Sequence, residues 1–293
     1  MNKVTINNLN TKNNSIIVDK YKLIFGFDLN LKNIIRSQIR KYFEKESRLE
    51  YDIENNIDNR IMINDRQIDL KKYDYIELFL QYDIKEDMKI GSKSIFQKYY
   101  DLLLEKIEYN EIFISTNNLL KTICDDINLS TDSEYVNTIT DLTKKLIIKM
   151  IELNLLKNEF EISQYSLTYE EVIKLQLKIV KEMAKIDELK DYLIFIDIPY
   201  ITDSILKELN HNYYNLILLV NTYAINEKLS IIDDSIAIAH NNIYDLSNEE
   251  QMYEIAMNCK RNLRINELKK ALTDKMIIRT KEVVSNIINE IID

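Results

Sequence analysis

Short apolar runs alternate with polar, asparagine-rich segments along the first part of the chain, as is typical of strands joined by turns. Val4–Leu9 and Ser15–Val18 predict a small hairpin, and Lys22–Phe25 predicts a buried strand. A turn opens at Gly26, and we expect a helix from about Lys32. Further strand candidates are Leu49–Ile53, Arg60–Ile63 and Gln67–Leu70, while Tyr75–Tyr82 fits a strand or a helix.

The spacing of apolar residues changes to that of helices from Lys93 onward. Thr116 is a candidate cap for one helix, and Thr131–Glu134 has capping-box spacing before a predicted long helix through Leu156. Thr168–Glu171 repeats this spacing before a helix that we expect to reach about residue 189. Before Thr116, the residues Ile95, Tyr99, Leu103 and Ile107 form an apolar stripe. The stripe of the helix after Thr131 is Ile139, Leu142, Leu146 and Met150, and that of the helix after Thr168 is Ile173, Leu177, Val180 and Ala184.

Apolar strands return in the last third of the chain. Tyr192–Ile198 is apolar throughout, as expected for a strand covered on both faces, and Pro199 ends it. Tyr214–Val220 and Ser235–Ala239 are two more such strands, and a helical tail runs from Ser247 to the end. The pattern predicts an α/β fold with a mostly parallel sheet. We expect a head domain from residues 1–84 and 190–246, a helical insertion over 85–189 and a helical extension over 247–293.

Composition narrows the class of protein. The 293 residues include only 2 glycines and 1 proline, which favours long helices over a loop-rich all-β fold. The net charge of −9 provides no global attraction for DNA or an anionic membrane, so any nucleic-acid site has to be a local patch. Two isolated cysteines, the lack of a secretory signal and the lack of a spanning apolar run predict a cytoplasmic protein.

The segment Gly26–Asn33 matches the spacing of a phosphate-binding P-loop with two departures. Leu31 replaces the second glycine, and Asn33 replaces the serine or threonine that binds Mg²⁺. Asp197 lies near the end of the apolar strand Tyr192–Ile198, where a P-loop fold would present the carboxylate that helps to bind Mg²⁺. The pattern fits a nucleotide-binding scaffold that has decayed, and it equally fits a strand–turn–helix with a chance glycine and Lys32.

Several groups of basic residues are candidates for phosphate contact. One stripe lies on the helix that starts near residue 169, a shorter one precedes it, and residues 260–281 carry 8 basic residues against 2 acidic ones, so 8 − 2 = +6. The alternative is that these are solvated helix faces. The candidate DNA-binding residues are Lys32, Arg36, Arg40, Lys144, Lys145, Lys149, Lys174, Lys178, Lys181, Lys185, Lys260, Arg261 and Arg264.

An acidic connection is the one candidate for a metal site. Asp125, Asp126, Asp132 and Glu134 crowd one link between predicted helices, and Ca²⁺ prefers several such oxygen ligands. The alternative is a cluster of capping and turn residues. The two histidines lie far from either cysteine, which excludes common zinc spacings. No catalytic constellation is evident, and we expect a protein that is not an enzyme.

Taken together, these features resemble a known family, the spacer-acquisition accessory proteins of subtype II-A CRISPR–Cas systems. The likeness rests on the N-terminal hairpin with Ile61–Ile84, on the helical insertion, and above all on Asp191–Leu246 with its order of strand, short helix, strand and closing strand. Residues 247–293 look like the C-terminal extension of the longer subfamilies.

The resemblance implies a degenerate P-loop fold that holds Ca²⁺ and binds no nucleotide. It implies a ring-shaped homotetramer that threads linear double-stranded DNA through a lysine-lined hole. It further implies that the protein acts together with the CRISPR integrase complex and the effector nuclease. It implies that the protein catalyses no reaction and does not associate with a membrane. The alternatives from the residues alone are a P-loop-derived nucleotide enzyme and a structural scaffold that does not bind DNA.

Overall fold

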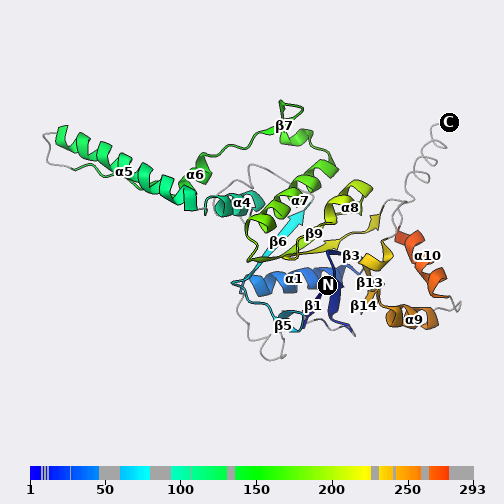
Figure 1. Ribbon diagram of the computed structural model, residues 1–293. Coiled ribbons are helices and arrows are strands. Elements are labelled where there is room, and N and C mark those ends of the chain that lie inside the picture. The colour runs from blue at the N-terminus through cyan, green and yellow to red at the C-terminus, as the bar shows by residue number, and fades with distance from the viewer. Residues whose placement is uncertain are drawn as a thin grey trace, which may run out of the picture. The chain divides into compact units, whose positions relative to one another are not determined.

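A computed structural model describes residues 1–7, 9, 11, 13–26, 28–45, 60–79, 94–105, 107–130, 136–225, 231–239, 242–258 and 264–276. The chain divides into two compact units (Figure 1). The first contains residues 1–80 and 188–293, and the second contains residues 81–187. The predicted strand Leu49–Ile53, Gly91, His240 and Cys259 lie outside the described residues.

The first unit is built on a six-stranded sheet with the strand order β14-β13-β3-β11-β9-β6. Its strands are β3 (Tyr21–Phe25), β6 (Tyr73–Phe79), β9 (Asp191–Asp197), β11 (Leu216–Asn221), β13 (Ser235–Ala239) and β14 (Asn242–Asp245). All neighbouring pairs are parallel except β13 with β14. The predicted α/β fold with a mostly parallel sheet is therefore confirmed, and the described part of the segment Tyr75–Tyr82, which ends at Phe79, lies in strand β6.

A second, four-stranded antiparallel sheet follows the order β2-β1-β4-β5. Its strands are β1 (Asn2–Ile6), β2 (Ser15–Val18), β4 (Ile61–Ile63) and β5 (Arg66–Gln67). The N-terminal hairpin is as predicted, whereas the strand expected over Gln67–Leu70 is wrong, because the chain turns after Gln67. One buried core joins this sheet, helix α1 (Leu29–Phe43) and one face of the large sheet, with Ile6, Ile35 and Phe195 among its members.

The turn after β3 explains the glycine at position 26. Gly26 has φ +116°, and a Cβ at this position would lie 2.1 Å from the carbonyl oxygen of Ile238 in β13. Both the conformation and the close approach exclude a side chain here. Helix α1 begins at Leu29, earlier than predicted, because the Asp28 carboxylate caps it by accepting from the Leu31 N–H at 3.0 Å. Gly26 thus packs β3 against its neighbour.

The rest of the first unit completes the sheet edge. Thr202 caps α8 (Asp203–Leu209), and β10 (Tyr200–Ile201) pairs with β12 (Ala224–Ile225) beyond the ends of β9 and β11. The short 3₁₀ helix η2 (Ile232–Asp234) leads into β13. The predicted tail contains α9 (Glu249–Asn258) and α10 (Ile265–Met276), and both belong to this unit.

The second unit is mostly helical. It contains α4 (Ile95–Leu103), α5 (Ile107–Ser130), α6 (Lys144–Met150), η1 (Gln164–Ser166), α7 (Tyr169–Ile186) and a hairpin of β7 (Leu155–Lys157) and β8 (Phe160–Ile162). The Thr168–Glu171 capping box is confirmed with both reciprocal hydrogen bonds, and the predicted buried stripe of α7 is 0–1% exposed. Within the described ranges, no helix combines the length and apolar character that a bilayer crossing needs.

Three predictions for this unit are wrong. Thr116 does not start a helix, because α5 continues through it, and the stripe from Ile95 to Ile107 is split between α4 and α5. The long helix expected after residue 131 is also wrong. Residues 136–143 are extended, and α6 covers only seven residues with Thr143 as its cap.

Two asparagines of α5 explain the extended segment. Asn128 Oδ1 accepts from the Asn137 N–H at 2.7 Å, and its Nδ2 donates to the Asn137 carbonyl at 2.9 Å. Asn117 makes the same pair of bonds with Leu142, at 2.7 and 3.2 Å. Because each amide satisfies both backbone groups of one residue, the segment keeps its hydrogen bonds without becoming helical.

Candidate functional site

Polar side chains converge at the carboxyl ends of three adjacent strands of the large sheet. Asp197 ends β9, Asn221 ends β11 between β9 and β3, and Lys32 comes from α1, which follows β3. Asn221 Nδ2 donates to Asp197 Oδ1 at 2.8 Å. The edge formed by the carboxyl ends of parallel strands is the usual ligand-binding edge of an α/β sheet.

Lys32 does not face an open phosphate cradle. Its side chain is buried, its Nζ donates to the Thr222 carbonyl at 3.1 Å, and its ammonium lies 4.5 Å from the centre of the Tyr223 ring. Burial lowers the pKa of Lys32 to about 8, although the nearby carboxylate of Asp197 opposes the shift. The lysine is held by groups of its own chain at the place where a P-loop lysine would meet a phosphate.

Asn221 is a member of this cluster that the sequence interpretation missed. It is 6% exposed, and its Oδ1 has no hydrogen-bond partner. The sequence contained a signal for it, because Asn221, like Asp197, is a polar residue at the carboxyl end of an apolar strand. A buried amide oxygen without a partner is costly, and a bridging water or small donor is the group that it would accept.

The low pKa of Lys32 predicts a pH-dependent stability. Between pH 8 and 10.5 the unfolded chain binds the extra proton, so the penalty for burying the charged lysine falls as the pH rises. We therefore compare the free energy of unfolding of Lys32→Met with that of the wild type at two pH values. The difference in favour of the variant should be larger at pH 7 than at pH 10, by roughly 1–3 kcal/mol. Urea unfolding of both proteins at each pH measures this difference. Parallel stability curves for the two proteins would contradict it.

The two α1 arginines are engaged in ion pairs. Arg36 Nη2 lies 2.9 Å from Glu77 Oε2, and its guanidinium stacks 4.6 Å from the centre of the Phe79 ring. Arg40 Nε lies 3.1 Å from Glu44 Oε1 and its Nη1 3.8 Å from Glu77, and these carboxylates raise the pKa of Arg40. Their proposed DNA contacts therefore compete with intramolecular partners, of which Glu77 was not foreseen.

The lysine face of α7 consists of Lys174, Lys178, Lys181 and Lys185. Lys178 and Lys185 are exposed, whereas Lys174 and Lys181 are half-buried. Lys174 lies 3.7 Å from Glu170 and Lys185 lies 3.9 Å from Glu182, both at pairing distances typical of a solvated helix. The four lysines lie on one side of the helix and can reach consecutive phosphates.

The remaining predicted residues are scattered. On α6, Lys145 and Lys149 are exposed and Lys144 is half-buried. Burial, with a smaller contribution from the charge of Glu105, raises the pKa of Asp101 in α4, and the charges of Lys145 and Lys144 oppose this shift. Arg264 is exposed at the start of α10, where its backbone N–H donates to Glu267. Lys260 and Arg261 lie outside the described residues.

The predicted calcium ligands are not brought together within the described part of the chain. Asp125 and Asp126 are exposed near the end of α5, and Asp132 and Glu134 lie outside the described residues. Among the residues that the structure describes, no group of three or more His, Cys, Asp or Glu side chains is arranged to hold a metal ion. Calcium binding stays a prediction.

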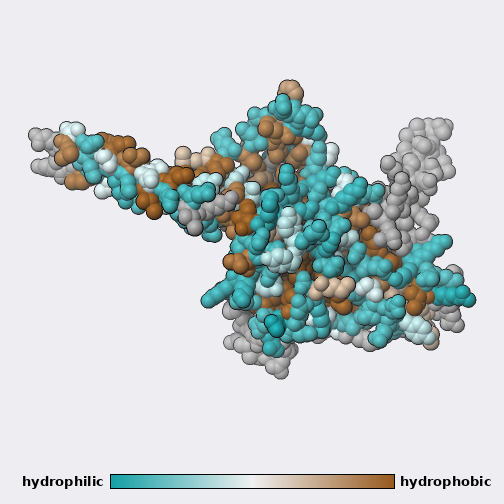
Figure 2. Space-filling model, viewed as in Figure 1, coloured by the Kyte–Doolittle hydropathy of each residue, from teal (hydrophilic) through white to brown (hydrophobic). Residues whose placement is uncertain are grey.

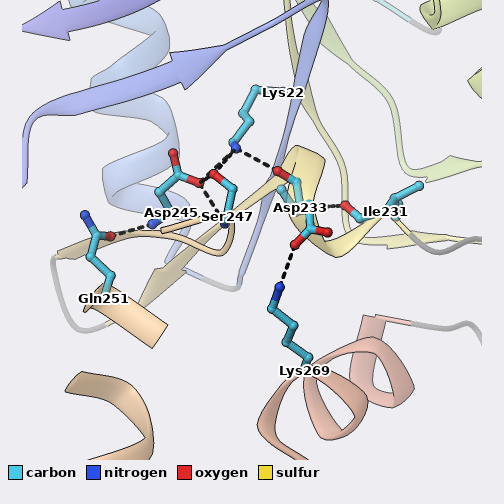
Figure 3. A network of polar contacts seen from close by, with 8 residues as sticks. Lys22, Ile231, Asp233, Asp245, Ser247, Gln251 and Lys269 are labelled. Carbon is cyan, nitrogen blue, oxygen red and sulfur yellow. Dashed lines mark hydrogen bonds and ion pairs between the residues drawn. The ribbon is translucent and has the colours of Figure 1, made fainter. Parts of the chain in front are cut away.

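A buried polar network tethers the C-terminal part of the first unit (Figure 3). Lys22 of β3 and Asp245 of β14 form an ion pair at 2.8 Å with side chains that are 4% and 5% exposed. Lys22 Nζ also donates to the Asp233 carbonyl at 3.1 Å and to Ser247 Oγ at 3.3 Å. All three ammonium donors are therefore used, and at the surface Lys269 of α10 pairs with the Asp233 carboxylate at 2.7 Å.

Comparison with known proteins shows a likeness of fold. No protein-family profile and no curated protein sequence matches the chain. Among solved structures, the chain is similar to Stu0660 of Streptococcus thermophilus, with a TM-score of 0.64 and 16% identity. The match covers 96% of this chain and 88% of Stu0660. Both units of the chain therefore have counterparts in one solved protein.

Proposed function

We propose that the chain is a non-catalytic DNA-binding protein of CRISPR adaptation, which assembles as a homotetrameric ring around linear double-stranded DNA. The observation that carries the proposal is the fold shared with Stu0660 over nearly the full length of both chains. The assignment to CRISPR adaptation comes from the resemblance of Asp191–Leu246 to the spacer-acquisition family. Spacer acquisition with the CRISPR integrase complex and the effector nuclease is the process that we assign to it.

The lysine face of α7 supports duplex binding through phosphates. Four lysines along one side of a helix provide a local positive strip in a protein with a net charge of −9. Phosphate contacts of this kind bind duplex without reading its sequence, and their strength falls steeply with salt. In a ring, the strips of several subunits would act on one duplex.

The exposed apolar residues of α5 support self-association. Tyr109, Ile112, Leu119, Ile123 and Ile127 recur at spacings of three, seven, four and four, which places them along one stripe of the helix. They are 39–66% exposed. Asn117 and Asn128, by contrast, hold the extended segment to another side of α5. A long apolar stripe in contact with water is typical of a helix that packs against a partner.

We include calcium binding in the proposal because of the acidic residues near the end of α5. Asp125 and Asp126 supply two carboxylates, and Asp132 and Glu134 are close enough in sequence to add two more. A cation at this position would offset the clustered negative charge.

A nucleotide-binding enzyme is the second candidate. Its support is the convergence of Lys32, Asp197 and Asn221 at the ligand-binding edge of the sheet. The contacts of Lys32 with Thr222 and Tyr223 and the substitutions at Leu31 and Asn33 weigh against it. ATP or GTP turnover that is abolished in Lys32→Ala would favour this candidate over the first.

Duplex binding is the direct test of the proposed function. Fluorescence anisotropy with a labelled linear duplex in low salt and Ca²⁺ should show saturable binding to the full chain. The affinity should fall linearly with salt on a logarithmic scale, with a slope that counts the phosphates contacted. Absence of binding in low salt with Ca²⁺ would reject the proposal and leave the nucleotide-binding enzyme and the structural scaffold as candidates.

A further inference from the structure

The β7–β8 hairpin of the second unit presents large apolar side chains to solvent. Leu156 is 69% exposed, Phe160 is 76% exposed, and Tyr165, which directly follows the hairpin in η1, is 87% exposed. Apolar surface gathers over this part of the chain in Figure 2, at the place that Figure 1 labels β7. Neither the proposed DNA contacts nor the stripe of α5 uses these residues.

The hairpin is locally well defined. Asn158 and Glu159 form its two-residue turn with φ of +52° and +70°, the conformation that best matches the twist of two paired strands. Lys157 ties the hairpin to the start of α7, because its Nζ lies 2.7 Å from Glu171 Oε1. Hydrogen bonds from Lys157 and from Thr168 lower the pKa of Glu171 to about 2. The apolar side chains are therefore offered on an ordered frame.

The apolar surface wraps around the hairpin. Leu156 pairs across the strands with Glu161, and Phe160 pairs with Lys157. Because neighbouring residues of a strand point to opposite faces, Leu156 and Phe160 lie on opposite faces of the hairpin. A hollow of about 200 Å³, lined in part by Leu155, Ile162 and Tyr165, adjoins them. A partner has to contact both faces, and the hollow can receive one of its side chains.

The charge around the hairpin selects the partner. Residues 151–171 contain five glutamates and one lysine, so the segment carries −5 + 1 = −4, and Lys174 of α7 offsets one of these charges at Glu170. The one lysine, Lys157, is already paired with Glu171. Glu159 and Glu161 are exposed beside the apolar side chains. The backbone of Glu159 is in the left-handed region, which residues other than glycine rarely adopt. Nucleic acid and anionic lipid would both be repelled here.

We propose that the β7–β8 hairpin is a docking surface for a basic, apolar segment of another protein. Leucine or aromatic residues of the partner cover Leu156 and Phe160 and fill the hollow beside Tyr165. Lysine or arginine residues of the partner pair with Glu159 and Glu161. Aromatic side chains that are desolvated on binding, and shielded from water by the contacts around them, are the usual anchors of such interfaces. The proposal does not depend on DNA binding, because the surface excludes polyanions.

A displayed library of random peptides tests this chemistry directly. Selection on the immobilised full chain should enrich peptides that combine Lys or Arg with Leu, Phe or Trp. The best peptide should bind at least tenfold more weakly to Leu156→Ser/Phe160→Ser and to Glu159→Lys/Glu161→Lys. Tyr214→Ser, which removes an aromatic ring that is 74% exposed in the first unit, is the matched control and should bind unchanged.

Three results would overturn the proposal. The first is a library that enriches no basic, apolar peptides. The second is equal binding of the selected peptide to the wild type and to both hairpin variants. The third is a lower oligomer mass for Leu156→Ser/Phe160→Ser in light scattering, which would assign the surface to a second copy of the chain. Because all five substituted side chains are exposed, circular dichroism melting should show the same stability for every variant.

Discussion

Replacement of Lys22 by methionine is expected to destabilise the first unit by about 3–5 kcal/mol. The substitution leaves the Asp245 carboxylate buried without its cation, in a position where Asp245 Oδ2 already has no partner. It also removes the donors that bind the Asp233 carbonyl and Ser247 Oγ. Since β3 lies inside the sheet, the loss should affect the whole unit. Urea unfolding followed by circular dichroism measures it.

Two controls separate the buried pair from ordinary surface charge. Lys22→Met/Asp245→Leu replaces both partners with apolar groups and should recover much of the lost stability. Lys269→Met breaks the ion pair with Asp233, whose carboxylate is 71% exposed, and should cost less than about 1 kcal/mol. A cost for Lys22→Met as small as that for Lys269→Met would contradict the assigned role of the network.

Reversal of the lysine face of α7 is expected to reduce duplex affinity by at least a hundredfold. The variant carries Lys174→Glu, Lys178→Glu, Lys181→Glu and Lys185→Glu. Each lost phosphate contact should also lower the logarithmic salt slope by about 0.9, so a loss of 3 to 4 units is expected if all four lysines take part. Anisotropy with a linear duplex at several salt concentrations measures both quantities.

A lysine outside this face provides the control. Lys207 of α8 is exposed in the first unit, and Lys207→Glu adds the same kind of charge change away from α7. It should change the affinity by only a few-fold. Unchanged binding by the α7 variant would mean that its lysines are a solvated face, and the DNA contacts would then have to come from another part of the chain.

The parts of the fold that the sequence predicted share one property, which is that local signals agree with tertiary packing. β9 and β11 are apolar without interruption because both faces are covered in a parallel sheet. Thr168 and Glu171 cap α7 through bonds within four residues, so their spacing alone identifies the start of the helix.

The largest failure comes from contacts between separate elements of the fold. The helix expected after residue 131 is replaced by an extended segment because Asn117 and Asn128 bond its backbone from α5. No local pattern marks this, because asparagine on a helix surface is ordinarily solvated. The extended segment and α5 thus form a unit that propensity could not reveal.

The candidate site follows the same rule. The sequence identified Gly26, Lys32 and Asp197 as candidate residues, but it did not predict the contacts that they make. Gly26 serves a close approach to Ile238, and the ammonium of Lys32 is held by Thr222. Likewise, the partner of Arg36 is Glu77, which lies on a strand 41 residues away. Periodicity identifies the buried face of α7, but it fails for Ile139, Leu146 and Met150, which are 39%, 37% and 72% exposed. The identity of a polar partner depends on the fold.

The preference for DNA ends is the most direct test of the proposed ring. A labelled linear duplex bound to the full chain in Ca²⁺ is competed with unlabelled duplex of the same sequence, either linear or closed covalently into a circle. A subunit ring that threads duplex from its ends predicts that the linear competitor displaces the label at least tenfold more effectively than the circle. Equal competition by the closed circle would contradict encirclement of linear DNA.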